Sequence, residues 1–287
     1  MSTISLITPE LFNLNENYVS HLDQYGYAVI KDILTPLERI NYYLKFIKEF
    51  KQVSSNFDFN DKTTWTNQNL PIMLSKGMVI YNGLAHGNSI WSLRTNKNIQ
   101  SIFKKIHNTD ELITSFDGFS MFVKKEQKSK AWLHIDQNPK NTIYSIQGSY
   151  NYLDVKPNDS GFICVPKSHK TFKPKNITHN KDWIPLTEED TYEGNVVKLI
   201  LPKNCFVIWD SKLIHANVGM TKQEPNINRL TSYITMFPRG MQTLENKQKR
   251  IEAYINGKAC SHWPNKCEIK RYPFGFKKIT RKRISII

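Results

Sequence analysis

Two histidines and one aspartate in this sequence have the types and spacing of a metal site. His134 and Asp136 are separated by one residue, and His215 follows after 78 intervening residues. Residues two apart on a strand point to the same side, so His134 and Asp136 can bind one ion together. Two imidazoles and one carboxylate on a ferrous ion leave three positions open for a cosubstrate and dioxygen. We predict that these three residues bind iron and carry the catalysis, with His215 supplied by a distant strand.

The length and composition are ordinary for a globular protein, because 287 residues are enough for one large domain with a substantial core. No apolar run reaches the roughly 18 residues that a transmembrane helix needs, and the N-terminus lacks the pattern of a secretory signal. The four cysteines include no C-x-x-C pair, which fits reduced thiols inside a cell. We therefore expect a cytoplasmic protein that does not enter a membrane.

Positive charge is concentrated near the C-terminus. The net charge is +15, and residues 247–287 hold 12 Lys or Arg against two Glu. Such a segment can contact phosphates or an acidic partner, although a solvated tail explains it as simply. Binding of nucleic acid or another polyanion through residues 270–287 therefore stays open.

Three possible metal ligands also lie in this region. Cys260, His262 and Cys267 lack the spacing of the usual zinc-binding pairs, so we favour two ordinary thiols over a structural zinc site.

The first part of the chain predicts helices around one short strand. Thr35, Pro36 and Glu38 form a good helix start, and the spacing of Ile40, Leu44 and Ile47 predicts the buried face of that helix. We expect helices at 9–25, 36–50 and 98–107, a strand at 27–30 and a turn at 110–113.

From Ser115 onward the pattern changes to short strands rich in β-branched and aromatic residues. We expect residues 195–201 and 205–209 to pair across the turn at 202–204. About eight strands separated by turns predict a mainly β fold with flanking helices, a double-stranded β-helix or jelly roll. We expect residues 1–245 to form this domain with its N-terminal helices, and residues 246–287 to form a basic extension packed on it. The predicted strands are 116–123, 133–136, 142–153, 162–165, 195–201, 205–209, 213–218 and 229–237.

Five sequence blocks occur in a characteristic order: Leu22–Ile30, His134–Gln137, Ser160–His169, Phe206–His215 and Asn228–Tyr233. Together they resemble the phytanoyl-CoA dioxygenase family of iron(II)- and 2-oxoglutarate-dependent oxygenases. The resemblance spans roughly residues 20–240. In the family's V-P-G-S-H turn, this chain has Lys167 in place of the glycine.

The resemblance implies Fe²⁺, 2-oxoglutarate and O₂ as cofactors and cosubstrates. Arg229 is expected to hold the distal carboxylate of 2-oxoglutarate, because a guanidinium can grip a carboxylate at two points. Asn217 stands where the family often has a small hydroxyl that helps this contact. Gln147 is a further candidate for cosubstrate binding, with a plain core hydrogen bond as the alternative. Weaker candidates for carboxylate contact are Arg94 and Lys124, and the expected pocket walls are Trp132 and Trp209.

The implied reaction is oxidative decarboxylation of 2-oxoglutarate coupled to hydroxylation of a small molecule whose identity the sequence does not give. Related halogenating enzymes replace the carboxylate ligand with a small residue, so Asp136 favours hydroxylation. The segment 259–264 resembles a subgroup extension expected over the mouth of the active site. The alternatives are a jelly-roll binding protein without catalysis and a polyanion-binding protein that uses the basic tail.

Overall fold

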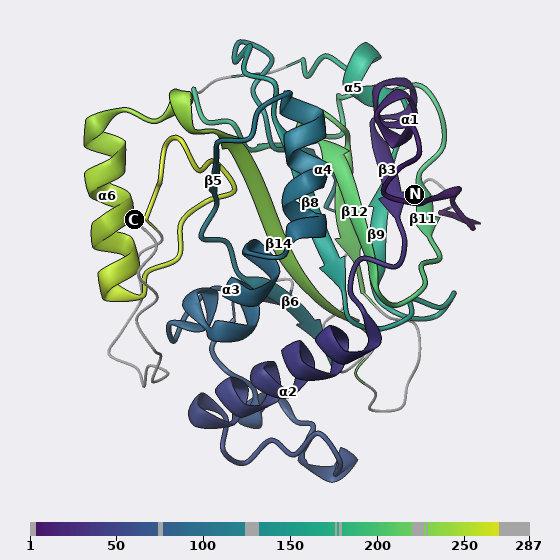
Figure 1. Ribbon diagram of the computed structural model, residues 1–287. Coiled ribbons are helices and arrows are strands. Elements are labelled where there is room, and N and C mark those ends of the chain that lie inside the picture. The colour runs from purple at the N-terminus through teal and green to yellow at the C-terminus, as the bar shows by residue number, and fades with distance from the viewer. Residues whose placement is uncertain are drawn as a thin grey trace.

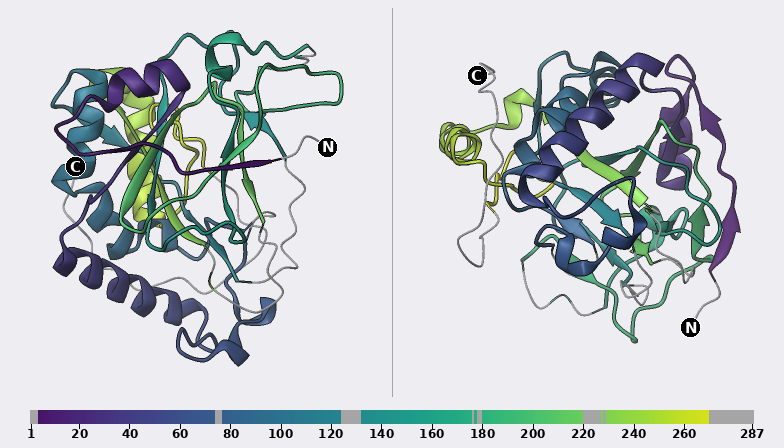
Figure 2. Two further views of the ribbon diagram at one scale, coloured as in Figure 1. Left: turned by 90° about the vertical axis from the view of Figure 1, so that its right-hand side faces the viewer. Right: turned by 90° about the horizontal axis from the view of Figure 1, so that it is seen from below.

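The computed structural model describes residues 4–73, 77–123, 132–175, 177, 180–219, 227 and 229–269 (Figure 1). These residues form two facing β-sheets, with helices against the outer side of the larger sheet (Figure 2). None of the described helices combines the length and the apolar character needed to cross a bilayer.

Each sheet joins strands that are far apart in the chain. In spatial order, the smaller sheet contains β1 (Ser5–Ile7), β11 (Val197–Leu199), β9 (Gly161–Cys164), β13 (His215–Val218), β7 (His134–Ile135) and β10 (Ile184–Pro185). The larger sheet contains, again in spatial order, β2 (Leu11–Phe12), β3 (Tyr27–Ile30), β12 (Cys205–Asp210), β8 (Ile146–Asn151), β14 (Arg229–Pro238), β6 (Phe119–Phe122) and β4 (Met78–Val79), with β5 (Leu112–Thr114) paired to β14. The α-helices are α1 (Tyr18–Tyr25), α2 (Pro36–Val53), α3 (Asn88–Arg94), α4 (Lys97–His107), α5 (Ser168–Thr171) and α6 (Leu244–Asn256).

Strand β12 shows how the larger sheet divides its side chains between two layers. Phe206 faces the helices and packs against Phe103 of α4. Val207 and Trp209 point the other way and pack with Phe162 of the smaller sheet. This alternation fills the space between the sheets on one side and anchors the helices on the other. Two facing, mostly antiparallel sheets that do not close into a barrel confirm the predicted jelly roll.

Helix α2 begins as predicted but buries a different face. The Thr35 hydroxyl accepts a hydrogen bond from Glu38 N, and the Glu38 carboxylate accepts one from Thr35 N, which completes a capping box. Ile40 and Leu44 are 57% and 56% exposed, whereas Phe46 lies in the core. The helix has two apolar stripes, and the aromatic one meets the sheet, so the predicted face was wrong.

Three further predictions of local structure were wrong. The predicted helix over 9–25 is a short strand, β2, followed by α1, which begins after Asn17 because that side chain accepts a hydrogen bond from Ser20 N. The predicted turn at 110–113 overlaps strand β5. Strands β11 and β12 do not pair with each other: they belong to different sheets, so residues 202–204 carry the chain from one sheet to the other.

The position that replaces the family's turn glycine keeps a glycine-like conformation. Lys167 has a φ of 71°, in the left-handed region, immediately before α5. Its backbone N–H donates to Tyr25 O at 2.9 Å, and the following Ser168 hydroxyl accepts from Ile214 N at 2.9 Å. The turn therefore holds the strand that leads to His215.

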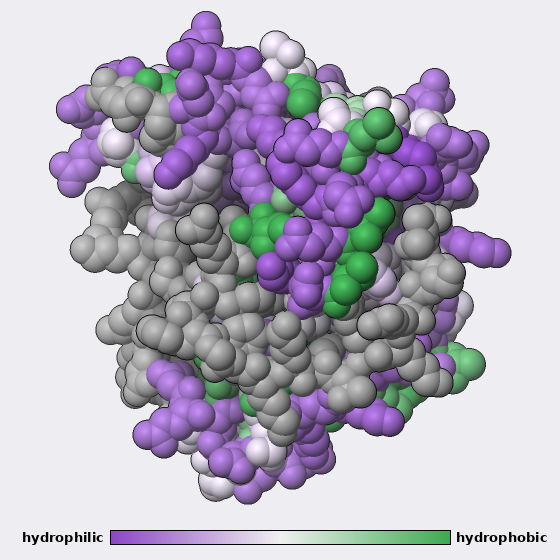
Figure 3. Space-filling model, turned by 90° about the vertical axis from the view of Figure 1, so that its left-hand side faces the viewer, coloured by the Kyte–Doolittle hydropathy of each residue, from purple (hydrophilic) through white to green (hydrophobic). Residues whose placement is uncertain are grey.

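The predicted domain boundary at 245/246 falls inside α6. Ala253 of this helix packs with Trp91 and Phe116, and Cys260 N donates to Phe116 O at 3.0 Å. On the side of α6, the part of the surface that is coloured in Figure 3 is mostly hydrophilic, with small groups of hydrophobic residues between. The proposed polyanion-binding segment, residues 270–287, lies outside the described residues.

Candidate active site

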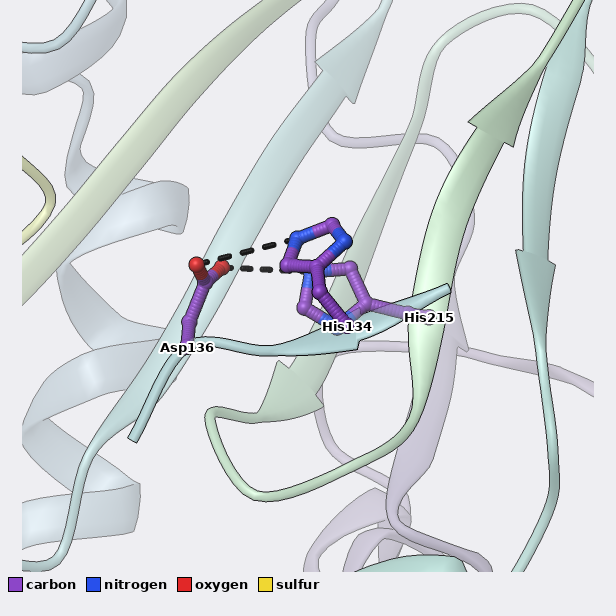
Figure 4. Close-up of side chains that lie close together, drawn as sticks. All are labelled: His134, Asp136 and His215. Atoms are coloured by element: carbon purple, nitrogen blue, oxygen red, sulfur yellow. Dashed lines mark ion pairs between the residues drawn. The ribbon is translucent and has the colours of Figure 1, made fainter. Parts of the chain in front are cut away.

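Strands β7 and β13 bring the three predicted ligands together. His134 lies opposite His215 in their register, and the neighbouring Ile135 and Ala216 pack on the outer side of the sheet, so both imidazoles point inward. Asp136 follows directly after β7. Its Oδ2 lies 3.2 Å from His215 Nε2 and its Oδ1 lies 3.7 Å from His134 Nε2 (Figure 4). One ligand atom from each residue lies within 4.8 Å of the others.

Backbone carbonyls orient both imidazoles in the same way. His134 Nδ1 lies 3.1 Å from Trp132 O, and His215 Nδ1 lies 2.9 Å from Leu213 O. Because a carbonyl oxygen only accepts, Nδ1 carries the proton in each neutral ring. The lone pair of each Nε2 is therefore directed toward Asp136, as a metal ligand requires.

Burial favours neutral imidazole in the site. Burial is the largest influence on His134 and lowers its pKa, and the nearby His215 lowers it further. For Asp136, burial acts to raise the pKa, but the charge of the nearby His262 opposes burial, and the pKa lies well below its usual value. A carboxylate beside two neutral imidazoles is a donor set that fits a divalent ion such as Fe²⁺.

Gln147 contacts the aspartate of the site. Its Nε2 donates to Asp136 Oδ2 at 2.9 Å and to the Ser211 hydroxyl at 3.2 Å. Ser211 O in turn accepts from Asp136 N at 2.8 Å. Strand β8 therefore supports the carboxylate through Gln147, and cosubstrate binding by Gln147 stays a prediction.

Arg229, the first residue of β14, is almost completely buried, at 1% exposure. Among the described residues, its Nε and Nη1 have no hydrogen-bond partner. Burial lowers the pKa of Arg229, and Tyr233, which hydrogen-bonds it, opposes this effect. Buried guanidinium N–H groups without partners are costly, so this arrangement fits a residue that binds a carboxylate.

Asn217 and Tyr233 connect Arg229 with the cavity. Asn217 Nδ2 donates to the Tyr233 hydroxyl at 2.9 Å, and that hydroxyl lies 2.7 Å from the Ser120 hydroxyl. Both Asn217 and Tyr233 line the cavity, whereas Arg229 does not. Tyr233, which the sequence reasoning missed, thus contacts both Asn217 and Arg229, and the role of these two residues in holding 2-oxoglutarate stays a prediction. The position of Tyr233 four residues after Arg229 on one strand was the available signal.

The metal-ligand candidates lie in a cavity of about 590 Å³. Trp132 stacks on His134, with ring centroids 4.4 Å apart and planes 3° from parallel. Trp209 lies 5.5 Å from the ring of His215, centroid to centroid. Both tryptophans line the cavity, as the sequence predicted.

Two loops that the strand pattern does not reveal complete the cavity. The first, residues 180–183, includes Trp183, which is 43% exposed and lies 5.9 Å from His134 between ring centroids. The second is residues 259–269, called the C-terminal loop, which contributes His262 and Trp263 to the lining. An ion pair between Lys266 and Asp182 joins the two loops. The expected packing of segment 259–264 over the site is therefore confirmed.

Other sequence candidates lie elsewhere. Arg94 is buried outside the cavity lining and donates to Ala85 O at 2.7 Å and to Asp117 O at 2.8 Å. Lys124 lies outside the described residues. Within the described ranges, Cys260, His262 and Cys267 do not form a second group of metal ligands.

Comparison with known proteins gives relatives of similar length. No family model matches the chain. The chain is 30% identical over 273 residues to Ava biosynthesis cluster protein O of Aspergillus versicolor, which covers 85% of this chain and 86% of that protein. It is also 18% identical over 315 residues to a Dictyostelium discoideum protein named "Putative phytanoyl-CoA dioxygenase", covering 90% of this chain and 84% of that protein.

Solved structures share the fold. The α-ketoglutarate-dependent epimerase SnoN from nogalamycin biosynthesis has a TM-score of 0.54 at 12% identity, covering 77% of this chain and 82% of SnoN. HygX from Streptomyces hygroscopicus, with nickel and 2-oxoglutarate bound, has a TM-score of 0.53 at 13% identity, covering 79% of this chain and 88% of HygX. By its likeness in sequence, this chain belongs to the same family as Ava biosynthesis cluster protein O, and the more distant Dictyostelium protein carries the family name that the five sequence blocks resemble.

Proposed function

We propose that this protein is an iron(II)- and 2-oxoglutarate-dependent dioxygenase that hydroxylates a small molecule. The observation that carries the proposal is the convergence of two oriented imidazole Nε2 atoms and one carboxylate in the wall of one cavity. In this proposal His134, Asp136 and His215 bind the metal. Their donor set also favours hydroxylation, since Asp136 keeps the carboxylate that halogenating relatives lack.

Each protein group has a defined task. Bound iron, when present, supplies the activation of dioxygen and the decarboxylation of 2-oxoglutarate to succinate and carbon dioxide. Gln147 holds Asp136 in place through one carboxylate oxygen. Arg229 offers two buried N–H groups to the distal carboxylate of 2-oxoglutarate, with Tyr233 and Asn217 beside it. The aromatic lining excludes water from the reacting centre.

The aromatic residues that line the cavity favour a small substrate that contains rings. Trp183 is partly exposed, with its ring centroid 5.9 Å from that of His134, and His262 and Trp263 line the cavity from the C-terminal loop. Such rings favour stacking with flat molecules. The relatives agree with this class: one is named for a biosynthesis cluster, and SnoN has been crystallised with α-ketoglutarate and nogalamycin RO.

The test is succinate formation by the purified full-length chain with Fe²⁺, 2-oxoglutarate and oxygen. We expect slow succinate release without substrate, and the visible absorption of an Fe²⁺–2-oxoglutarate chelate when oxygen is removed. His134→Ala should abolish both signals. His169→Ala is the matched control, because His169 contacts Asp23 O at 3.0 Å on another part of the molecule and does not line the cavity.

The alternatives give different results. A jelly-roll binding protein would bind 2-oxoglutarate without releasing succinate under any condition, and that outcome contradicts the proposed enzyme. A polyanion-binding protein would bind DNA or RNA with steep salt dependence, lost on deletion of residues 270–287. This second activity is compatible with the first, and nothing in the described residues favours it.

A further inference from the structure

Two thiols lie in contact at the base of the C-terminal loop. The Sγ atoms of Cys260 and Cys267 are 2.8 Å apart, and both side chains are buried. The other two cysteines have different surroundings: Cys164 packs between the sheets, and Cys205 Sγ accepts a hydrogen bond from Asn151 Nδ2 at 3.5 Å. The chain therefore contains one matched pair of neighbouring thiols and two single thiols for comparison.

The backbone of the loop places the two thiols together. Cys260 pairs with Ile269 in an antiparallel bridge, and Ser261 N donates to Glu268 O at 3.2 Å. Cys267 has a φ of 47°, in the left-handed region of backbone conformation that residues other than glycine and asparagine rarely adopt. The hydrogen bond from Cys267 N to Trp263 O, at 3.1 Å, holds this conformation. Strain of this kind persists only where the surrounding structure requires it.

The thiol pair closes a loop that forms part of the cavity. Ser261, His262, Trp263 and Lys266 lie between the two cysteines and line the cavity, and Glu268 lines it directly after Cys267. Each cysteine is thus next in sequence to a residue that lines the cavity. A covalent link between the thiols would therefore fix the position of this wall.

We propose that Cys260 and Cys267 are an oxidisable pair, which a hydroperoxide converts to a disulfide that fixes the C-terminal wall of the cavity. In the first step the Cys267 thiolate attacks a peroxide oxygen. The O–O bond breaks, Cys267 becomes a sulfenic acid, and the alkoxide or hydroxide that leaves takes up a proton. In the second step Cys260 loses its proton and attacks the Cys267 sulfur. The S–S bond forms and the sulfenic oxygen leaves as water, so two thiols are oxidised and one peroxide is reduced.

The electrostatics support this order of attack. The hydrogen bond between the two thiols lowers the pKa of Cys267; burial opposes this effect, and the charge of Arg250 adds to it. The same hydrogen bond, together with burial, raises the pKa of Cys260. Arg250 also donates to Pro264 O at 3.2 Å, so this cation is fixed against the loop. Cys267 is therefore the thiol with more thiolate character.

The test counts thiols on the full-length chain treated with hydrogen peroxide in the presence of a metal chelator. Trypsin can cleave after Lys258, Lys266 and Lys270, so the two cysteines fall on separate peptides. We expect a crosslinked peptide pair that disappears on reduction with dithiothreitol, while Cys164 and Cys205 still react with an alkylating agent. Cys260→Ser and Cys267→Ser should each remove the crosslink, and Cys205→Ser should leave it. Neither 2-oxoglutarate nor substrate is needed, so the result is independent of the proposed function.

A second measurement tests the effect on the wall. Hydrogen exchange of residues 261–266 should slow several-fold in the oxidised chain relative to the reduced chain. The proposal is overturned if Cys260 and Cys267 react with peroxide no faster than Cys164 and Cys205. It is also overturned if they form only sulfinic acid without a crosslink, or if hydrogen exchange of the loop is unchanged.

Discussion

The cavity has one wall made of strands and another made of loops, and their side chains are held in different ways. On the strand wall, His134 and His215 lie opposite each other in one register, and each is oriented by the carbonyl two residues before it. On the loop wall, Trp183 and Trp263 are positioned by loops joined through the Lys266–Asp182 ion pair. Backbone pairing thus fixes the chemistry, and side-chain contacts fix the space for the substrate.

This difference indicates where amino-acid substitutions are tolerated. A ligand on a paired strand cannot shift without breaking the hydrogen bonds of the sheet. A side chain on a loop can be replaced, and the loss is confined to its own contacts. We therefore expect substitutions on the strand wall to abolish turnover and substitutions on the loop wall to change substrate preference. Variants on each wall test that division.

Removal of a strand-wall ligand should have the largest effect. His215→Ala leaves one imidazole and one carboxylate, so iron affinity should fall by roughly a hundredfold or more, since loss of supporting residues alone costs about 10–100-fold. Isothermal titration with Fe²⁺ under anaerobic conditions measures the affinity, and succinate release measures the activity. A His215→Ala chain that releases succinate at the wild-type rate contradicts the assignment of this ligand.

Gln147→Leu should have the next largest effect, because it removes the hydrogen bond to Asp136 Oδ2 without removing a ligand. Iron affinity should fall by about 10–100-fold. Gln147→Glu is the sharper companion, since it places a second carboxylate against Asp136 and should raise the pH needed for iron binding. If both variants bind iron as tightly as the unchanged protein, Gln147 has only a packing role.

Arg229→Gln should weaken 2-oxoglutarate binding while leaving iron binding intact. Hydrogen bonds to charged groups contribute about 1.5–3 kcal/mol, so KM for 2-oxoglutarate should rise on the order of 10- to 100-fold. Arg229→Lys keeps the charge but loses the forked geometry and should recover only part of the affinity. An unchanged KM in both variants would place the cosubstrate carboxylate elsewhere.

The strand wall could be predicted from the sequence because its signals are local or periodic. The spacing of His134 and Asp136 places both on one side of an extended segment, and the block that ends at His215 belongs to a recognisable strand. The same reasoning missed the contact of Gln147 with Asp136, because that contact joins β8 of the larger sheet to the end of β7 in the smaller sheet. Packing of two distant strands against each other leaves no mark in either strand alone.

The loop wall could not be predicted in the same way. Asp182 and Lys266 are 84 residues apart in sequence, and neither lies on a helix or a strand. Helix α2 shows a related limit, since its two apolar stripes fit the helical period equally well, and only packing selects the one with Phe46. Periodicity reports that a segment has an apolar face, but it does not report which neighbour covers that face.

Loss of the loop-wall ion pair should have the smallest effect. Lys266→Met should change the free energy of unfolding by no more than about 1 kcal/mol, because this pair is partly exposed and such pairs contribute little. Asp182→Asn keeps the size of its side chain and part of its hydrogen bonding to Asn141, so it separates the charge from the shape. Chemical denaturation measures the stability, and the ratio of hydroxylated product to succinate measures substrate positioning. We expect that ratio to fall in both variants while iron affinity stays within about twofold of the unchanged protein, because both ligand histidines lie on paired strands. A large loss of iron affinity in Lys266→Met would show that the two walls are coupled and would refute the division between fixed chemistry and adaptable substrate space.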